Sequence, residues 1–278
     1  MASIDFGKRV AQRLAIQTHM DKIGRKILVM SGKGGVGKTT VAVGLAKSLV
    51  QKGFKVGILD TDLHGPNVAR MLDVDLAGKF HANENGMLEP VEAMPGLSIA
   101  GVDSAMEDAQ DAVIWRGPMK TMVINDLLSR VDWGYLDFLF IDSPPGSGDE
   151  QLTVCKSIPE LTGAIVVTTA QEVSILDAVR SVAFCRKMKI AILGLIENMG
   201  PLSCPHCGTT LEVFGSQHGI ELSRKIDVPF LGTIPLAVHQ SDGKGNPEQI
   251  LRSLDHIADS LKVFTVSHNV TKKENGNG

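Results

Sequence analysis

The chain has 278 residues, a length that suits one large α/β domain better than two domains. Hydrophobic residues make up 43% and charged residues 21%, which excludes disordered, coiled-coil and collagen-like chains. The net charge is −3, and the longest segment without charged side chains, residues 228–241, contains two prolines, so neither nucleic acid nor a membrane is expected as a partner.

The first residues are amphipathic and of mixed charge, so we expect a helical lead-in over residues 1–24 and no signal peptide. Apolar runs of four to seven residues then alternate with helical patterns. Such runs predict strands buried on both faces of a mostly parallel, twisted sheet flanked by helices, in a single α/β domain over residues 25–265. The predicted strands are Ile27–Met30, Val56–Leu59, Leu97–Gly101, Phe138–Ile141, Ala164–Thr168, Ile190–Ile196 and Phe230–Ile234.

Three further segments complete the predicted organisation. Apolar residues at helical spacing predict a helix over Thr39–Gln51, ended by a glycine two positions later. Residues 73–92 are rich in Gly, Asn and charge, which predicts an irregular excursion with a short hairpin near Asn85 and Gly86. Residues 266–278 have little apolar content, so a disordered tail is expected there.

A phosphate-binding loop is predicted between the first strand and the first internal helix. Residues 32–39, GKGGVGKT, match the pattern G-x-x-x-x-G-K-[ST] in the context that this motif requires. Its glycines let backbone N–H groups converge on phosphate oxygens, while the lysine neutralises them and the hydroxyl binds Mg²⁺. The predicted nucleotide contacts of this segment are Gly32, Lys33, Gly34, Gly35, Val36, Gly37, Lys38, Thr39 and Thr40.

Carboxylates follow two predicted strands at the edge of the sheet where ligands bind. Asp142, after an apolar run, is predicted to hold Mg²⁺ together with Thr39, and Asp60 to support Mg²⁺ or the loop beside it. Asp62 is the candidate for orienting the attacking water, with a helix cap or an Asx turn as the alternative. Lys38 is the predicted catalytic cation of an ATPase.

A Cys-x-x-Cys motif lies in a predicted loop near residues 200–215. The thiolates of Cys204 and Cys207 are candidate metal or cluster ligands, and a redox disulfide uses the same spacing. Because His206 lies between the two cysteines, a Cys₂His zinc site in one subunit is an alternative. Cys155 and Cys185 lie among apolar residues and receive no function. Four cysteines without a disulfide pattern indicate a reducing compartment. We expect the cytoplasm, with a processed organellar form as the alternative.

The segment GKGGVGKTT resembles the deviant P-loop of the nitrogenase iron protein, cell-division positioning ATPases and arsenite-pump ATPases. In those proteins the early lysine reaches the nucleotide of a facing subunit, so the resemblance implies a nucleotide-bridged homodimer in which Lys33 acts in trans. It also implies that Asn198 binds the adenine edge and that Pro235 lines the base pocket. A two-fold dimer would unite two Cys-x-x-Cys motifs and supply four thiolates.

Further segments extend the resemblance to most of the chain. The stretches LDTDLHGPN, FIDSPPGSGDEQLT, IENMGPLSCPHCG and FLGTIPL, together with the P-loop, resemble the Mrp/ApbC family of iron–sulfur cluster carrier ATPases. The resemblance implies an ATP-hydrolysing homodimer that holds a labile [4Fe–4S] cluster between its subunits, receives it from cluster donors and passes it to apo-proteins. The expected member is a minimal one, without the small N-terminal domain or the N-terminal four-cysteine motif of some relatives.

Two other functions remain open at this point. One is an electron-transfer protein resembling the nitrogenase iron protein, although its ligating cysteines would be far apart in sequence. The other is a positioning or scaffold ATPase that uses zinc as a structural staple. That function would need a membrane-seeking terminal helix, and the sequence ends in the polar residues KKENGNG.

Overall fold

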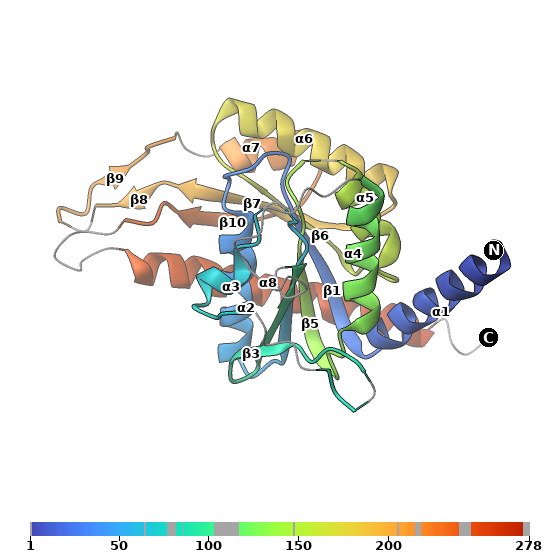
Figure 1. The fold of residues 1–278 in the computed structure, drawn as a ribbon. Helices are drawn as coiled ribbons and strands as arrows, with labels where there is room; N and C mark the ends of the chain where they lie inside the picture. Colours follow the sequence, from blue (N-terminus) through green and yellow to red (C-terminus); the bar gives the residue numbers. More distant parts are fainter. Residues whose placement is uncertain are drawn as a thin grey trace.

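The fold centres on one large twisted sheet with helices on both faces (Figure 1). In this computed structural model, the described residues are 2–63, 65–76, 82–84, 86–102, 117–146, 148–204, 206–214, 218–238 and 246–274. The sheet has eight strands in the order β10-β7-β6-β1-β5-β2-β4-β3, and every pairing is parallel except that of β3 with β4. The predicted fold class is confirmed. The strands are β1 (Ile23–Met30), β2 (Val56–Asp60), β3 (Val91–Met94), β4 (Leu97–Gly101), β5 (Leu136–Asp142), β6 (Gly163–Thr168), β7 (Ile192–Gly200) and β10 (Phe230–Pro235).

Two hydrophobic clusters cover the two faces of the sheet. One cluster joins the sheet to α2, α3 and α8, and the other joins it to α1, α4, α5, α6 and α7. In the part of the chain that the structure describes, none of the helices combines the length and apolar character that a bilayer crossing needs. The helices are α1 (Ala2–Met20), α2 (Lys38–Gln51), α3 (Val68–Met71), α4 (Gly117–Arg130), α5 (Asp149–Ser157), α6 (Glu172–Lys187), α7 (His218–Lys225) and α8 (Pro247–Glu274).

Alternation of side chains along the strands explains why the apolar runs are continuous. In β1, Ile27 and Val29 enter the cluster under α2, whereas Leu28 and Met30 enter the cluster on the opposite face. Each of the seven predicted runs corresponds to a strand. The largest difference is in β7, which was expected over Ile190–Ile196 but starts two residues later and continues to Gly200.

Two further predictions concern the hairpin near Asn85 and Gly86 and the C-terminal tail. An antiparallel bridge joins Ala82 to Leu88, and the N–H of Gly86 donates to the carbonyl of Asn83 at 2.8 Å, so a turn lies where the hairpin was predicted. Asn85 itself lies outside the described residues. Helix α8 extends over residues 266–274, which were expected in the tail, and residues 275–278 are not described. The domain limits remain predictions.

Candidate nucleotide site and cysteine hairpin

The predicted phosphate-binding loop connects the end of β1 to the start of α2. Gly35 and Gly37 have φ angles of 81° and 83°, in the left-handed region that favours glycine. A Cβ atom on Gly37 would also lie 2.1 Å from Nδ2 of Asn198, so the loop is packed closely against β7. These two positions leave the backbone free to curve around a ligand in front of the N-terminus of α2.

Asp142 at the end of β5 binds the first two residues of α2. Its Oδ1 accepts a hydrogen bond from Nζ of Lys38 at 2.6 Å, and its Oδ2 accepts one from Oγ1 of Thr39 at 2.6 Å. Asp142 is fully buried, which raises the pKa of its carboxyl, while the charge of Lys38 opposes that rise. The structure therefore brings together three residues that sequence analysis assigned to phosphate and Mg²⁺ binding.

Asp60 lies beside Asp142 in register but makes a different set of contacts. Its carboxylate accepts hydrogen bonds from the backbone N–H groups of Asp62, Asn67 and Val68, at 3.0, 2.9 and 3.1 Å. Burial, followed by repulsion from Asp142, raises the pKa of Asp60 to about 7. The residue thus holds the loop between β2 and α3, which corresponds to the loop-supporting half of its predicted role.

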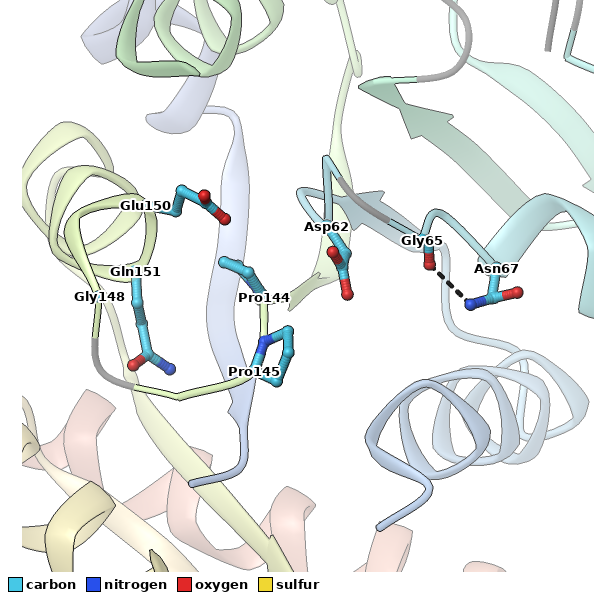
Figure 2. Close-up of a pocket in the computed structure, with 8 residues that line it drawn as sticks. All are labelled: Asp62, Gly65, Asn67, Pro144, Pro145, Gly148, Glu150 and Gln151. Atoms are coloured by element: carbon cyan, nitrogen blue, oxygen red, sulfur yellow. Dashed lines mark hydrogen bonds between the residues drawn. The ribbon is translucent and has the colours of Figure 1, made fainter. Parts of the chain in front are cut away.

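Asp62 lines a cavity of about 410 Å³ beside the phosphate-binding loop. Figure 2 shows it between the loop after β2, which carries Asp62, and the segment around Pro144 and Pro145 that leads to α5. A Cβ atom on Gly34 would lie 4.0 Å from Cβ of Pro145, so this segment also borders the phosphate-binding loop. The position suits a carboxylate that acts on water near the terminal phosphate.

Sequence analysis did not identify Gln151, which lines the same cavity. The side chain is fully buried, and its Nε2 lies 3.3 Å from Oγ of Ser143, directly after Asp142. Its Oε1 has no hydrogen-bond partner among the described residues. The only local signal was a polar residue in the first turn of α5, where the sequence pattern alone does not separate a buried side chain from a solvated one.

The other predicted nucleotide contacts lie around this centre. Lys33 and Thr40 are exposed, and the role of Lys33 on a facing subunit stays a prediction. Asn198 is buried, and its Nδ2 donates to the carbonyl of Val36 at 2.9 Å, so it contacts the phosphate-binding loop directly. Pro235 is buried at the end of β10, paired with Gly200 of the neighbouring strand β7.

The Cys-x-x-Cys motif lies in a small hairpin that continues from β7. The antiparallel strands β8 (Leu202–Ser203) and β9 (Thr210–Leu211) form its stem, which extends away from the main sheet in Figure 1. The backbone N–H of Cys204 donates to the carbonyl of Thr209, and the N–H of Gly208 donates to the carbonyl of Cys204, each at 2.8 Å. The motif therefore occupies a compact turn.

The two thiols of this hairpin are accessible. Cys204 is half-buried and Cys207 is exposed, and hydrogen bonding to Thr209 lowers the pKa of the Cys207 thiol. Among the described residues, no group of three or more His, Cys, Asp or Glu side chains is positioned to hold a metal ion, and His206 of the motif is exposed. The described part of one protomer thus presents two thiols without a third ligand.

The other cysteines have the opposite environment. Cys155 and Cys185 are buried in the cluster between the sheet and its helices, and burial raises the pKa of their thiols to about 11 and about 12. Thiols of this kind are unreactive because the thiolate is the nucleophilic form. Their environment is that of core side chains.

Known proteins are similar to this chain over most of its length. Residues 22–270 match a family model of the ParA group described as NUBPL iron-transfer P-loop NTPase. An iron-sulfur cluster carrier protein of Methanococcus maripaludis is 46% identical over 227 residues, which cover 82% of this chain and 78% of that protein. A protein of Drosophila simulans named cytosolic Fe-S cluster assembly factor Nubp2 homolog is 40% identical over 255 residues, covering 91% and 97% of the two chains.

Solved structures share the fold of this chain. A nucleotide-binding protein from Archaeoglobus fulgidus, solved in complex with ADP, matches with a TM-score of 0.70 and 34% identity over 89% of this chain and 92% of that chain. The cell division ATPase MinD of Pyrococcus furiosus matches with a TM-score of 0.60 and 24% identity over 86% of this chain and 98% of that chain. At that lower identity, the MinD match shows the fold alone.

Proposed function

The chain belongs to the NUBPL iron-transfer P-loop NTPases, and from this premise we propose that it is an ATP-hydrolysing carrier of iron–sulfur clusters. Two copies hold a labile [4Fe–4S] cluster as cargo between their paired Cys204 and Cys207 thiolates and pass it to apo-proteins. The observation that carries the proposal is that β7 leads from Asn198, which contacts the phosphate-binding loop, directly into the hairpin with the two accessible thiols.

The nucleotide half of the proposal rests on the contacts around Asp142. Lys38 leaves this carboxylate to neutralise the β and γ oxygens of ATP, and Thr39 and Asp142 hold Mg²⁺. The buried carboxylate with a hydroxyl beside it suits a hard divalent cation, which prefers oxygen ligands. Bound Mg²⁺ neutralises phosphate charge. Asp62 orients the attacking water, and Lys33 reaches the phosphates of the facing subunit.

The cargo half rests on ligand counting. A [4Fe–4S] cluster takes four protein ligands, whereas the hairpin of one protomer offers the thiols of Cys204 and Cys207. A two-fold axis doubles that number, and thiols at the protein surface allow a cluster to enter and leave. The fly relatives are named as cytosolic factors, and we assign the same compartment here, since it keeps thiols reduced.

The test is metal analysis of the full chain, purified and reconstituted without oxygen. We expect about four iron and four sulfide ions per dimer, and no bound cluster in a Cys204→Ala/Cys207→Ala variant. Cys155→Ala serves as the matched control, because it removes a buried thiol outside the hairpin and should keep its iron. Transfer is then followed as the activity gained by an apo-enzyme that needs a [4Fe–4S] cluster.

Each alternative predicts a different result. Stoichiometric zinc without iron uptake would show that the protein is a scaffold ATPase with a structural zinc site and not a cluster carrier. A cluster that stays on the protein, and is reduced and reoxidised as ATP is hydrolysed, would indicate an electron-transfer protein instead.

A further inference from the structure

A second cavity lies at the base of the cysteine hairpin, and Pro235, the residue predicted to line the base pocket, is part of its lining. Its volume is about 550 Å³, and it is bordered by the ends of β7 and β10, the stem of the hairpin and the first turns of α8. Figure 1 shows these elements together at one end of the sheet. The polar side chains that line it include Glu197, Ser203, Thr210, Thr233, Gln249 and Arg252.

Glu197 is an unusual lining residue because its carboxylate is buried and only one of its two oxygens accepts a hydrogen bond from a described residue. The residue is 1% exposed, and its Oε2 accepts a hydrogen bond from the backbone N–H of Gly219 at 2.6 Å. Its Oε1 has no partner among the described residues. Gln249, across the cavity on α8, has a second buried oxygen in the same condition. Unpaired buried oxygens are costly, so the cavity is suited to a ligand that donates hydrogen bonds.

The charges around the cavity define the sign of that ligand. Arg252 also lines it, but its guanidinium is largely exposed and pairs with Glu248, 3.4 Å away, rather than with Glu197. The exposed Glu212 of the hairpin adds a second carboxylate to the lining. The cavity is therefore acidic overall, and a cationic side chain complements it.

The neighbouring backbone adds a second mode of recognition. Among the described strands, β10 is the last of the sheet and pairs with β7 alone, so its other edge offers backbone donors and acceptors. Phe230 and Thr233 of β10 line the cavity, so this edge strand borders it. An extended segment can add to such an edge while one of its side chains enters the cavity.

We propose that this cavity, with the edge of β10, binds an extended segment of a recipient protein that inserts a lysine or arginine side chain toward Glu197. The inference rests on the carrier function proposed above, and it places the recipient next to the hairpin that holds the cluster. Main-chain pairing with β10 supplies affinity, and the charge pair with Glu197 supplies selectivity for a basic side chain.

The probe is a pair of capped pentapeptides, Thr-Val-Lys-Val-Thr and the same peptide with norleucine in place of lysine, which has no charge. Both are titrated into the ¹⁵N-labelled, cluster-free full chain, and backbone amide shifts are followed. We expect the lysine peptide to shift resonances of β10 and the start of α8 and to bind about tenfold more tightly than the norleucine peptide.

Two variants locate the interaction. Glu197→Gln keeps an acceptor for Gly219 and removes the charge, so it should abolish the preference for lysine, whereas Glu221→Gln, which changes an exposed residue of α7 outside the cavity lining, should change it less than twofold. Ser253→Trp, from the α8 side, fills the cavity and should prevent binding of both peptides.

Three results would contradict the inference. Equal binding of the two peptides, shifts away from β10, or a lysine preference that survives Glu197→Gln would each overturn the inference. Iron loading is measured on the same preparations. Normal loading without peptide binding would refute this site alone, while absent loading would refute the carrier function.

Discussion

The phosphate-binding end and the cysteine hairpin meet the needs of their ligands in opposite ways. At the first, Lys38 and Thr39 of α2 each donate a hydrogen bond of 2.6 Å to Asp142 of β5. At the second, Cys204 and Cys207 lie on a two-strand hairpin outside the main sheet, with few neighbours to hold them. One site is preorganised by contacts within the chain, whereas at the other the described residues offer no third ligand beside the two thiols.

The difference follows from what each ligand has to do. A nucleotide must be held against charge repulsion in a fixed geometry, which favours rigid, buried partners. A cluster that is passed on must be reachable, which favours exposed thiols and a hairpin that can move. β7 leads from one site toward the other, and only five residues separate Asn198 from Cys204.

The largest expected effect is on ATP hydrolysis when Lys38 is removed. This variant tests whether the nucleotide site and the cysteine hairpin act independently. Lys38→Ala should lower ATP hydrolysis 10²- to 10³-fold, as loss of one preorganised charge does, and leave reconstituted iron unchanged. The variant should fold, because burial raises the pKa of Asp142 and loss of the lysine charge raises it further, which favours the neutral acid. Phosphate release and iron content are measured.

Lys47→Ala, on the same helix but outside the phosphate-binding loop, is the control for Lys38→Ala. If Lys38→Ala lost its iron, the two sites would not be independent in the way that their geometry indicates, and the comparison would fail.

The second prediction concerns the pH dependence of the free energy of unfolding, to which the buried Asp60 contributes. An unfolded Asp60 releases its proton near 3.8, but the folded residue releases it near 7, so the folded state holds the extra proton between these values. Stability from this group therefore falls as pH rises through that window. Between pH 5 and pH 8, the nucleotide-free wild type should lose about 2–3 kcal/mol of unfolding free energy more than Asp60→Asn.

Urea unfolding at both pH values measures this difference. Parallel changes in the two proteins would mean that Asp60 titrates near its unfolded value and that its three backbone hydrogen bonds outweigh burial.

Sequence patterns predicted which residues meet at the phosphate-binding end better than they predicted the contacts of other buried acidic side chains. Glycine spacing and the acid after an apolar run sufficed for Lys38 and Asp142, because a parallel sheet brings strand ends to one edge. The role of Asp60 was less determined, since the pattern does not say whether a carboxylate faces a ligand or its own loop. The extent of β7 was missed because Glu197 is polar, and its burial depends on the N–H of Gly219 from a distant helix.

The third effect asks how tightly the phosphate-binding loop is packed on β7. Gly37→Ala introduces a Cβ 2.1 Å from the Asn198 amide and places alanine at φ 83°, whereas Gly53→Ala has a similar φ of 87° with nothing within 4 Å. Both variants place alanine at a left-handed φ angle and so share the same backbone strain. The difference between their losses of unfolding free energy is therefore due to the contact with Asn198. We expect Gly37→Ala to be less stable by a further 1–2 kcal/mol or so, measured by urea unfolding. Equal losses would show that the amide moves away freely.

The smallest expected effect addresses the connection between the sites. At saturating ATP, the rate at which a chelator removes iron from wild-type protein should differ about 3- to 10-fold from the nucleotide-free rate, a typical coupling between sites. Asn198→Ala removes the hydrogen bond to Val36 and should reduce that difference to less than about twofold, with iron content unchanged. Asn125→Ala on α4, outside both sites, is the control. A full nucleotide effect in Asn198→Ala would mean that the signal crosses between subunits rather than along β7, because Lys33 on the facing copy would then be the remaining contact between nucleotide and dimer geometry.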